Sequence, residues 1–288
     1  MCLREKLQIK NGFMDMDCLK KIISGMNGVL GVGISGWGEP LLNPEIIPIL
    51  EYMSKKGLLV SFITNGLLLK EYARDLVNIR TLYHIGMSFD TVPLNEGGKE
   101  HDNVDALSGL EALANQKAKK GAKYPLVRVT MTVMNRNVND MPNIVKLLAK
   151  YGAKWFDVHP ALPFIAENDA YCKEPTVIAF NKALEDAVAV GKRFGIKVTY
   201  NRKDAILGKS CSEATYAPCS HPWKAPFIDF RGDVHPCCFL VDYLLGNAIE
   251  TPLLSIWKNA SYVHLREKLL VAPMPVCTQV GCKPKSES

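Results

Sequence analysis

The sequence predicts an α/β protein with a parallel sheet, either a barrel or a doubly wound sheet, followed by a small cysteine-rich domain. The first observation is that apolar runs typical of strands alternate with helical patterns from residue 14 to residue 200. The second is that six of the nine cysteines lie after residue 205, in a stretch rich in Pro and Gly. We therefore predict two domains, residues 1–204 and residues 205–288.

Each element of the first domain has its own pattern. Asp15 can cap the first helix, Pro44 begins the second, Gly57 ends it, and Gly152 ends the fifth. The predicted helices span residues 14–26, 43–57, 70–79, 103–121, 138–152 and 175–194. The predicted strands span residues 28–35, 58–64, 82–89, 125–134, 153–160 and 196–200.

The array begins with a helix rather than a strand. Six helices flank the first five strands, so the strand that should precede residues 14–26 is missing. Without it the strand at residues 28–35 would stand at an open sheet edge, which proteins normally cover. We expect the natural reading frame to begin upstream of Met1 and to supply this strand.

The composition is that of an ordinary globular protein, with 48% hydrophobic and 22% charged residues. The net charge of +6 is mild, and no partner is inferred from it; we predict neither a nucleic-acid partner nor a membrane. No run approaches the ~18 apolar residues of a membrane helix, and no secretory signal is present. Nine cysteines without an export signal indicate reduced thiols in the cytoplasm.

Polar residues follow successive predicted strands, at the edge of a parallel sheet where ligands bind. The first strand ends in "SGWGEPLLNPE", in which Gly36 and Gly38 allow close backbone approach and Glu39 projects a carboxylate. A tight turn with a solvated glutamate would explain this motif alone. The later strands, however, also carry polar groups. Thr64, Asn65, Ser88, Asp90 and His159 lie at strand ends, and Arg128 lies within its strand, at a position that is more often apolar.

The C-terminal cysteines are spaced as metal ligands from a loop, a hairpin and a tail. Zinc and an iron–sulfur cluster both accept four thiolates, and the sequence alone does not separate them. Cys238 is a reserve ligand, Cys18 and Cys172 are expected to be packing or surface residues, and Cys211 is expected to be structural. The four candidate ligands are Cys219, Cys237, Cys277 and Cys282.

Taken together, these motifs resemble the radical S-adenosylmethionine (radical SAM) enzymes that carry a SPASM- or twitch-type auxiliary-cluster domain. The matching segments are "GWGEPLLNPE", "FITNG", "MSFD" and the tail "CSHPWKAPFIDFRGDVHPCC", with "GN" at 246–247 and "IWKN" at 256–259. The most specific part is the Cys219-x12-Gly232-x4-Cys237 spacing. The resemblance runs from Cys2 to Cys282 and implies a partial (β/α)6 barrel, here without its first strand.

The resemblance also implies a reaction. A 4Fe–4S cluster reductively cleaves S-adenosylmethionine (SAM) to a 5′-deoxyadenosyl radical, which abstracts hydrogen from a peptide or small-molecule substrate. The electron would come from a donor such as flavodoxin or ferredoxin. Glu39 would bind the SAM amino group within the turn of Gly36 and Gly38, Ser88 the ribose, and Arg128 the carboxylate, with Asn65 a weaker candidate.

Two implications concern the clusters. Cys219, Cys237, Cys277 and Cys282 would hold one auxiliary 4Fe–4S cluster, because the seven-cysteine pattern of two-cluster SPASM domains is absent. Cys2 fits the third ligand of the catalytic C-x3-C-x2-C loop, and the other two cysteines would precede Met1. As written, the chain is therefore expected to be inactive. The alternatives are a degenerate, non-catalytic relative that acts as a binding partner, and a zinc-ribbon protein with a coincidental Gly-Glu-Pro.

Overall fold

The structure is a computed structural model that describes residues 4, 8–90, 100–160, 175–200 and 219–279. The chain divides into two compact units. We call the described residues within 30–200 the sheet unit. The described residues within 8–29 and 219–279 form the cysteine unit.

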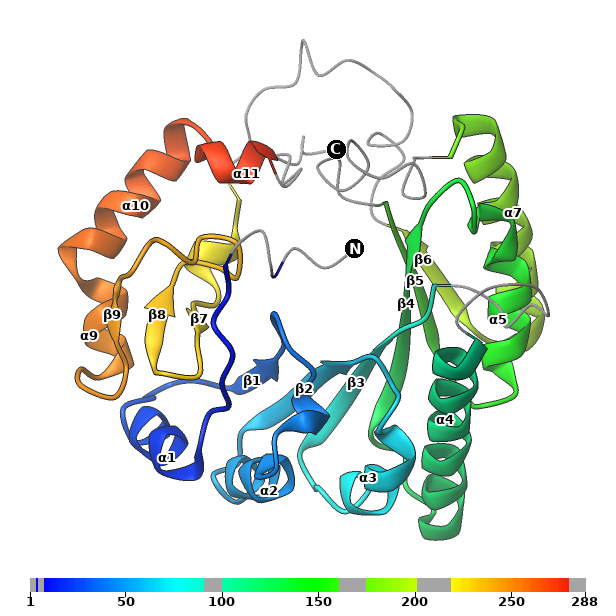
Figure 1. Cartoon of the computed structure of the whole chain (residues 1–288), viewed down its shortest axis with the longest axis horizontal. Coiled ribbons are helices and arrows are strands. Elements are labelled where there is room, and N and C mark those ends of the chain that lie inside the picture. Colours follow the sequence, from blue (N-terminus) through cyan, green and yellow to red (C-terminus); the bar gives the residue numbers. More distant parts are fainter. Residues whose placement is uncertain (1–3, 5–7, 91–99, 161–174, 201–218, 280–288) are drawn as a thin grey trace. The chain divides into compact units, whose positions relative to one another are not determined.

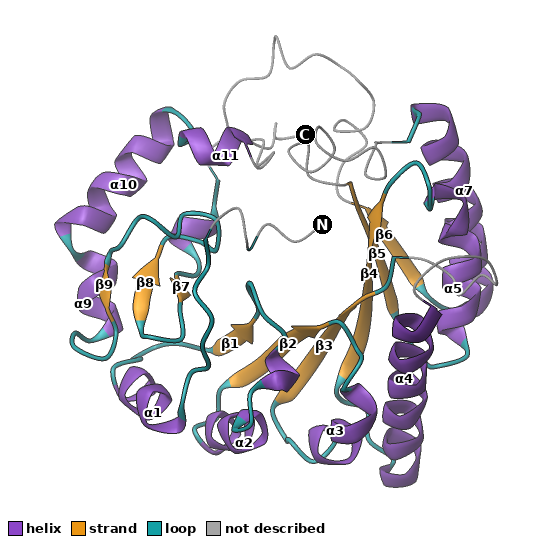
Figure 2. Ribbon diagram, in the orientation of Figure 1, coloured by secondary structure: helices purple, strands orange, loops and turns teal. Residues whose placement is uncertain are grey.

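The sheet unit is built on one parallel sheet whose strands follow one another in chain order from β1 to β6 (Figure 2). A doubly wound sheet would reverse this order at a switch point, so the unreversed order is that of a barrel wall. This observation decides between the two α/β arrangements left open by the sequence. The strands are β1 Gly31–Ile34, β2 Leu59–Thr64, β3 Leu82–Ser88, β4 Leu126–Val133, β5 Trp155–Pro160 and β6 Lys197–Tyr200.

The helices of this unit lie on the convex side of the curved sheet (Figure 1). They are α2 Ile46–Lys55, α3 Leu69–Leu76, α4 Glu100–Lys120, α5 Met141–Ala149 and α7 Val177–Phe194. Short 3-10 helices, η1 Pro40–Leu42 and η2 Val138–Asp140, precede α2 and α5. The predicted helix ends at Gly57 and Gly152 are confirmed, since both glycines adopt positive φ just beyond a helix. Pro44, by contrast, lies two residues before the start of α2.

Strand alternation gives the sheet two different faces. In β4, Val127, Val129 and Met131 are buried beneath the helices. The residues between them, such as Arg128, point to the opposite face, which we call the inner face. The strand register extends this assignment: Arg128 pairs with Gly86 on one side and Trp155 on the other, and Asp157 pairs with Thr130 and Thr199.

The cysteine unit contains a three-stranded antiparallel sheet packed with short helices. Its core contains Ile22, Val234, Leu245, Ala248, Leu253, Ile256, Tyr262, Leu265 and Leu269. Its elements are α1 Met16–Ser24, η4 His221–Trp223, β7 Phe227–Ile228, β8 Asp233–His235, β9 Gly246–Asn247, α9 Leu253–Lys258, α10 Ala260–Val271 and α11 Pro275–Gln279.

The position of α1 differs from the predicted division at residue 204. The sequence predicts that this helix belongs to the barrel domain. In the structure, its residue Ile22 packs into the core of the cysteine unit. The helix itself forms as predicted, because the Asp15 carboxylate accepts a hydrogen bond from the Cys18 amide at 2.7 Å. Cys18 packs against the same core, as the sequence predicted for it.

No helix among the described residues is both long enough and apolar enough to cross a membrane.

Candidate functional site

The carboxylate of Glu39 is held at the end of the neighbouring strand. The Thr64 hydroxyl and the Leu41 amide donate to its Oε1 atom at 2.7 and 3.1 Å, and the Asn65 amide donates to Oε2 at 2.7 Å. A carboxylate offers about four acceptor positions, so these three bonds leave one on Oε2 for a further donor. The structure thus holds Glu39 in place and leaves it able to accept one more hydrogen bond.

The two glycines before Glu39 differ in what the fold requires of them. Gly36 adopts a φ of 143°, which L side chains rarely adopt. A methyl group built on Gly38 would meet no atom within 4 Å, and the Gly38 φ is not positive. The protein fold therefore demands glycine at position 36 but not at position 38.

The ends of β3 and β4 are joined by a second polar network. The carboxylate of Asp90 accepts from the Thr132 amide at 2.7 Å, and the Asn137 side-chain amide donates to the carbonyls of Asp90 and Thr132. Burial raises the pKa of Asp90, while the Thr132 amide and the charge of Arg136 oppose this. Asp90 is therefore a structural residue, and Ser88, at the end of β3, remains exposed.

Arg128, Asp157 and Thr199 form a row across three strands of the inner face. The Nε of Arg128 and the hydroxyl of Thr199 donate to different oxygens of the Asp157 carboxylate. The Asp157 side chain is 4% exposed and that of Arg128 is 48% exposed. Since the pair uses Nε of Arg128, the two terminal nitrogens of its guanidinium are left for another partner.

Two histidines share the inner face with Arg128. Burial, and then the charge of Arg128, lower the pKa of both His84 and His159, so both are neutral at pH 7. The buried Nε2 atom of His84 has no hydrogen-bond partner in the described part of the chain.

In the cysteine unit, the turn before Cys237 is built by a side-chain network. Asp229 accepts from the amides of Arg231 and Asp233, and Gly232 between them adopts a φ of 86°. A Cβ on Gly232 would lie 2.7 Å from Ile249. The Asn247 side chain donates to the Arg231 carbonyl and the Asp233 carboxylate. These contacts give a physical reason for the glycine of the Cys219-x12-Gly232-x4-Cys237 spacing and for "GN" at 246–247.

Arg266 connects the loop after Cys219 to the helices. Its guanidinium donates to the carbonyls of Pro222 at 3.1 Å and Trp257 at 2.8 Å. The same group lies 4.1 Å from the ring centre of Trp257 and 3.8 Å from that of Tyr262, so cation–π attraction adds to the hydrogen bonds. Asn259 caps α10 by accepting from the Tyr262 amide and donates to the Leu245 carbonyl.

Three of the four predicted ligand thiols come within electrostatic range of one another. Burial chiefly raises the pKa of Cys237, the amides of Phe239 and Leu240 that hydrogen-bond to it lower that pKa, and Cys219 raises it. Burial likewise raises the pKa of Cys277, and the charges of Cys237 and Cys219 add to this. Burial and then Cys237 raise the pKa of Cys238 to about 11, without a contribution from the other two thiols.

These observations fit an iron–sulfur cluster at the C-terminal thiols. Backbone amides that donate to a ligating sulfur are a recognised feature of such centres, and mutual repulsion of thiolates is relieved by a bound cation. Within the described residues, no three His, Cys, Asp or Glu side chains are grouped so as to hold a metal ion. Cys2, Cys172, Cys211 and Cys282 lie outside the described residues.

The fold and these thiols define a class: a radical SAM-type barrel wall joined to an iron–sulfur domain. Residues 219–283 match the model of SPASM, an iron–sulfur cluster-binding domain. Streptococcus suis SuiB, solved bound to its precursor peptide SuiA, superposes with a TM-score of 0.67 at 17% identity, over 89% of this chain and 61% of SuiB.

Two curated relatives extend the comparison. The antilisterial bacteriocin subtilosin biosynthesis protein AlbA of Bacillus subtilis is 28% identical over 83% of this chain and 51% of AlbA. A tungsten-containing aldehyde ferredoxin oxidoreductase cofactor-modifying protein of Pyrococcus furiosus is 22% identical over 98% of this chain and 83% of that protein. The chain thus spans about half the length of AlbA. Residues 219–283 thus carry a SPASM domain, and the chain as a whole is similar to SPASM-containing radical SAM proteins.

Sequence reasoning missed several residues that the structure brings into these sites. Asp157 and Thr199 lie in predicted strands without a predicted role, and Arg266 lies outside every predicted element. The sequence could have identified Asp157 as a site residue, because a charged residue in the middle of a buried apolar strand is unusual. Nothing in the sequence identifies Arg266, since the residues that it contacts in the structure are distant along the chain.

Proposed function

We propose that the protein is a maturase-type radical SAM enzyme with one auxiliary 4Fe–4S cluster. It reductively cleaves SAM and abstracts hydrogen from a peptide or small-molecule substrate, with an electron from a donor such as flavodoxin or ferredoxin. When bound, the catalytic cluster supplies the electron for this cleavage, and Cys2 is its proposed ligand in this chain.

The observation that carries the proposal is the mutual electrostatic influence of Cys219, Cys237 and Cys277 within the segment that matches SPASM. The three thiols come from a loop, the end of a hairpin and α11, which are far apart in sequence. Cys282, five residues after Cys277, is the proposed fourth ligand. A single cluster suits this set, because four thiolates complete one 4Fe–4S centre.

In the sheet unit, the proposed SAM site runs along the strand ends from β1 to β4. Glu39 accepts from the SAM ammonium through its remaining lone pair, and Gly36 and Gly38 let the cofactor approach. Asn65 lies beside it, since its amide already binds Glu39. Ser88 binds the ribose, and the terminal nitrogens of Arg128 bind the SAM carboxylate in the two-pronged way that suits a guanidinium.

The substrate is proposed from the relatives. A peptide is supported by SuiB, which was solved with a precursor peptide, and by the bacteriocin role of AlbA. A small-molecule substrate is supported by the Pyrococcus furiosus relative, which is named as a cofactor-modifying protein and which this chain matches over most of both lengths. The protein groups serve either substrate by orienting SAM and keeping water out.

Anaerobic reconstitution with iron and sulfide tests the auxiliary centre. The 288-residue chain is expected to take up about four irons, with the Mössbauer spectrum of a 4Fe–4S cluster. Stoichiometric zinc in place of iron, or about eight irons per chain, would contradict the proposal. SAM cleavage is to be measured in a form that carries the C-x3-C-x2-C loop ahead of Cys2, with dithionite as the electron source.

Gly38→Ala tests the proposed SAM site. Because the added methyl group meets no protein atom, the midpoint of thermal unfolding should change little. Equilibrium dialysis should show SAM binding weakened by about tenfold or more, since the methyl group occupies the space proposed for the ligand. Wild-type affinity in a well-folded Gly38→Ala variant would exclude this turn from the site. Lys70→Gln, an exposed change on α3, is the control.

A further inference from the structure

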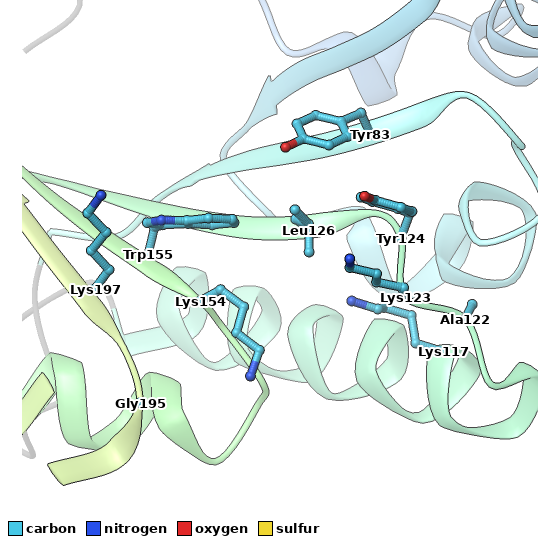
Figure 3. Close-up of a pocket in the computed structure, with 10 residues that line it drawn as sticks. All are labelled: Tyr83, Lys117, Ala122, Lys123, Tyr124, Leu126, Lys154, Trp155, Gly195 and Lys197. Atoms are coloured by element: carbon cyan, nitrogen blue, oxygen red, sulfur yellow. The ribbon is translucent and has the colours of Figure 1, made fainter. Parts of the chain in front are cut away.

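A cavity of about 730 Å³ opens at the amino ends of β3 to β6, the edge opposite the proposed SAM site (Figure 3). It is within the range of small-molecule sites. The strands contribute Tyr83, Leu126, Trp155 and Lys197, each at or next to the start of its strand. The remaining lining residues come from the end of α4 and the connections before β4, β5 and β6: Lys117, Ala122, Lys123, Tyr124, Lys154 and Gly195.

Strand register relates this cavity to the row of Arg128, Asp157 and Thr199. Trp155 and Lys197 are paired with each other, and each lies two residues before a member of that row on the same strand. Two residues along a strand return to the same face, about 6–7 Å further on. The cavity therefore shares the inner face with the row. It lies one layer before Asp157 and Thr199, while Trp155 is the register partner of Arg128.

The cavity wall carries four lysines and no acidic residue. In the described part of the chain none of the four, Lys117, Lys123, Lys154 and Lys197, forms a salt bridge. Burial, and then the charge of Lys154, lower the pKa of Lys117. Like charges held together without a counter-ion create a positive potential that attracts anions.

Aromatic rings share the wall with these cations. Tyr83 and Tyr124 lie with ring centres 5.3 Å apart, and the Lys123 ammonium is 5.5 Å from the Tyr124 ring. In Figure 3 the ammonium ends of Lys117 and Lys123 extend in the same direction from one side of the cavity, and the indole of Trp155 lies opposite. Cationic groups beside exposed ring faces match a ligand that combines negative charge with a flat ring.

A role in stabilising the fold explains only one of the four lysines that line the cavity. Lys117 is in the last turn of α4, where a cation is favoured by the helix dipole, and it donates to the Pro125 carbonyl at 2.7 Å. Lys123, Lys154 and Lys197 lie outside helices. We propose that the cavity binds a small organic anion with two or more phosphate groups and a flat ring, the chemical class of a nucleoside diphosphate or triphosphate.

Isothermal titration calorimetry of the full chain with ATP tests this proposal, with SAM in excess so that a nucleotide does not enter the strand-end site. We expect one site with a dissociation constant below about 1 mM and an affinity that falls with added salt. Adenosine and inorganic pyrophosphate, which each lack one recognised feature, should bind at least about fivefold more weakly than ATP.

Two variants assign the binding to this cavity. Lys154→Gln with Lys197→Gln should weaken ATP binding by about tenfold or more, through loss of two cations. Trp155→Leu should weaken it by about fivefold through loss of stacking. Lys70→Gln with Lys182→Gln removes the same charge from exposed positions on α3 and α7 and should stay within about twofold of wild type. Circular dichroism melting checks that each variant is folded.

Four results would overturn the proposal. They are no ATP binding at millimolar concentration, equal affinity for ATP and pyrophosphate, unchanged affinity in the Lys154 and Lys197 double variant, and tighter binding of a hexaglutamate peptide than of ATP. The last would identify the cavity as a site for an acidic protein segment. Failure of this proposal is distinguishable from failure of the proposed radical SAM activity, because the lysine variants leave the proposed SAM-binding residues unchanged. Trp155 neighbours Arg128 in register, so SAM binding is also measured in Trp155→Leu.

Discussion

Cys237→Ala is expected to abolish the auxiliary cluster, lowering the iron bound after reconstitution from about four atoms per chain to below one. Cys237 follows β8 directly, where the Asp229, Gly232 and Asn247 network shapes the turn. Backbone amides hydrogen-bond to its sulfur, and the Cys237 thiol interacts electrostatically with both Cys219 and Cys277. Without it, the loop and the helical tail have no common metal to hold them.

Loss of the cluster should also destabilise the cysteine unit. This unit has a small core, and a bound metal centre contributes to folding because the site does not exist in the unfolded chain. Thermal unfolding of reconstituted protein, followed by calorimetry, should show a lower midpoint for Cys237→Ala than for wild type. The difference should disappear when both are measured without iron.

Two neighbouring cysteines provide matched controls. Cys18→Ala removes a partly buried thiol of the same unit that donates to the Phe230 carbonyl, and it should retain the cluster. Cys238→Ala should also retain most of the iron, because Cys237 is the one of the three thiols that raises the pKa of Cys238. Retention of iron in Cys237→Ala, together with its loss in Cys238→Ala, would make Cys238 the ligand.

Arg128→Met should lower the free energy of unfolding by roughly 2–4 kcal/mol. The substitution leaves the carboxylate of Asp157, whose side chain is only 4% exposed, with the Thr199 hydroxyl as its remaining side-chain donor in the described part of the chain. Uncompensated burial of a charge is costly. Asp157→Leu should cost less, because the guanidinium of Arg128 is 48% exposed and water can replace its partner.

The double variant distinguishes pairing from other effects of these residues. Replacing both partners by apolar side chains should cost less than Arg128→Met alone, because no buried charge remains. Urea denaturation of the wild type, both single variants and the double variant measures this as a thermodynamic cycle. Additive losses across the four proteins would show that Arg128 and Asp157 do not stabilise the sheet through each other.

The order of the elements was predictable from the sequence, because apolar periodicity is local. The strands β2, β3 and β4 form within one or two residues of the predicted limits, and the helix ends at Gly57 and Gly152 follow from glycine's access to positive φ. The position of Glu39 after a predicted strand also identified it as a candidate site residue, because the carboxyl ends of parallel strands lie at one edge of the sheet, where ligands bind.

The sequence did not predict which residues contact each other across the fold, because these contacts depend on register between strands and on packing between distant segments. A shift of one residue between β4 and β5 would turn Asp157 away from Arg128, and nothing local in either strand specifies that register. The same is true of Arg266, which joins Pro222 to Trp257, and of Ile22, which carries α1 into the core of the cysteine unit.

By itself, the sequence determined the parallel α/β order, the strand-end position of Glu39 and the cysteine spacing around Gly232, because each depends on neighbours along the chain. Only the tertiary structure decided that Thr64 and Asn65 hold Glu39, that Cys219 and Cys237 both influence the pKa of Cys277, and that four lysines line one cavity. These features depend on how segments that are far apart in sequence pack against one another. That packing is determined jointly by side-chain volume, strand register and burial.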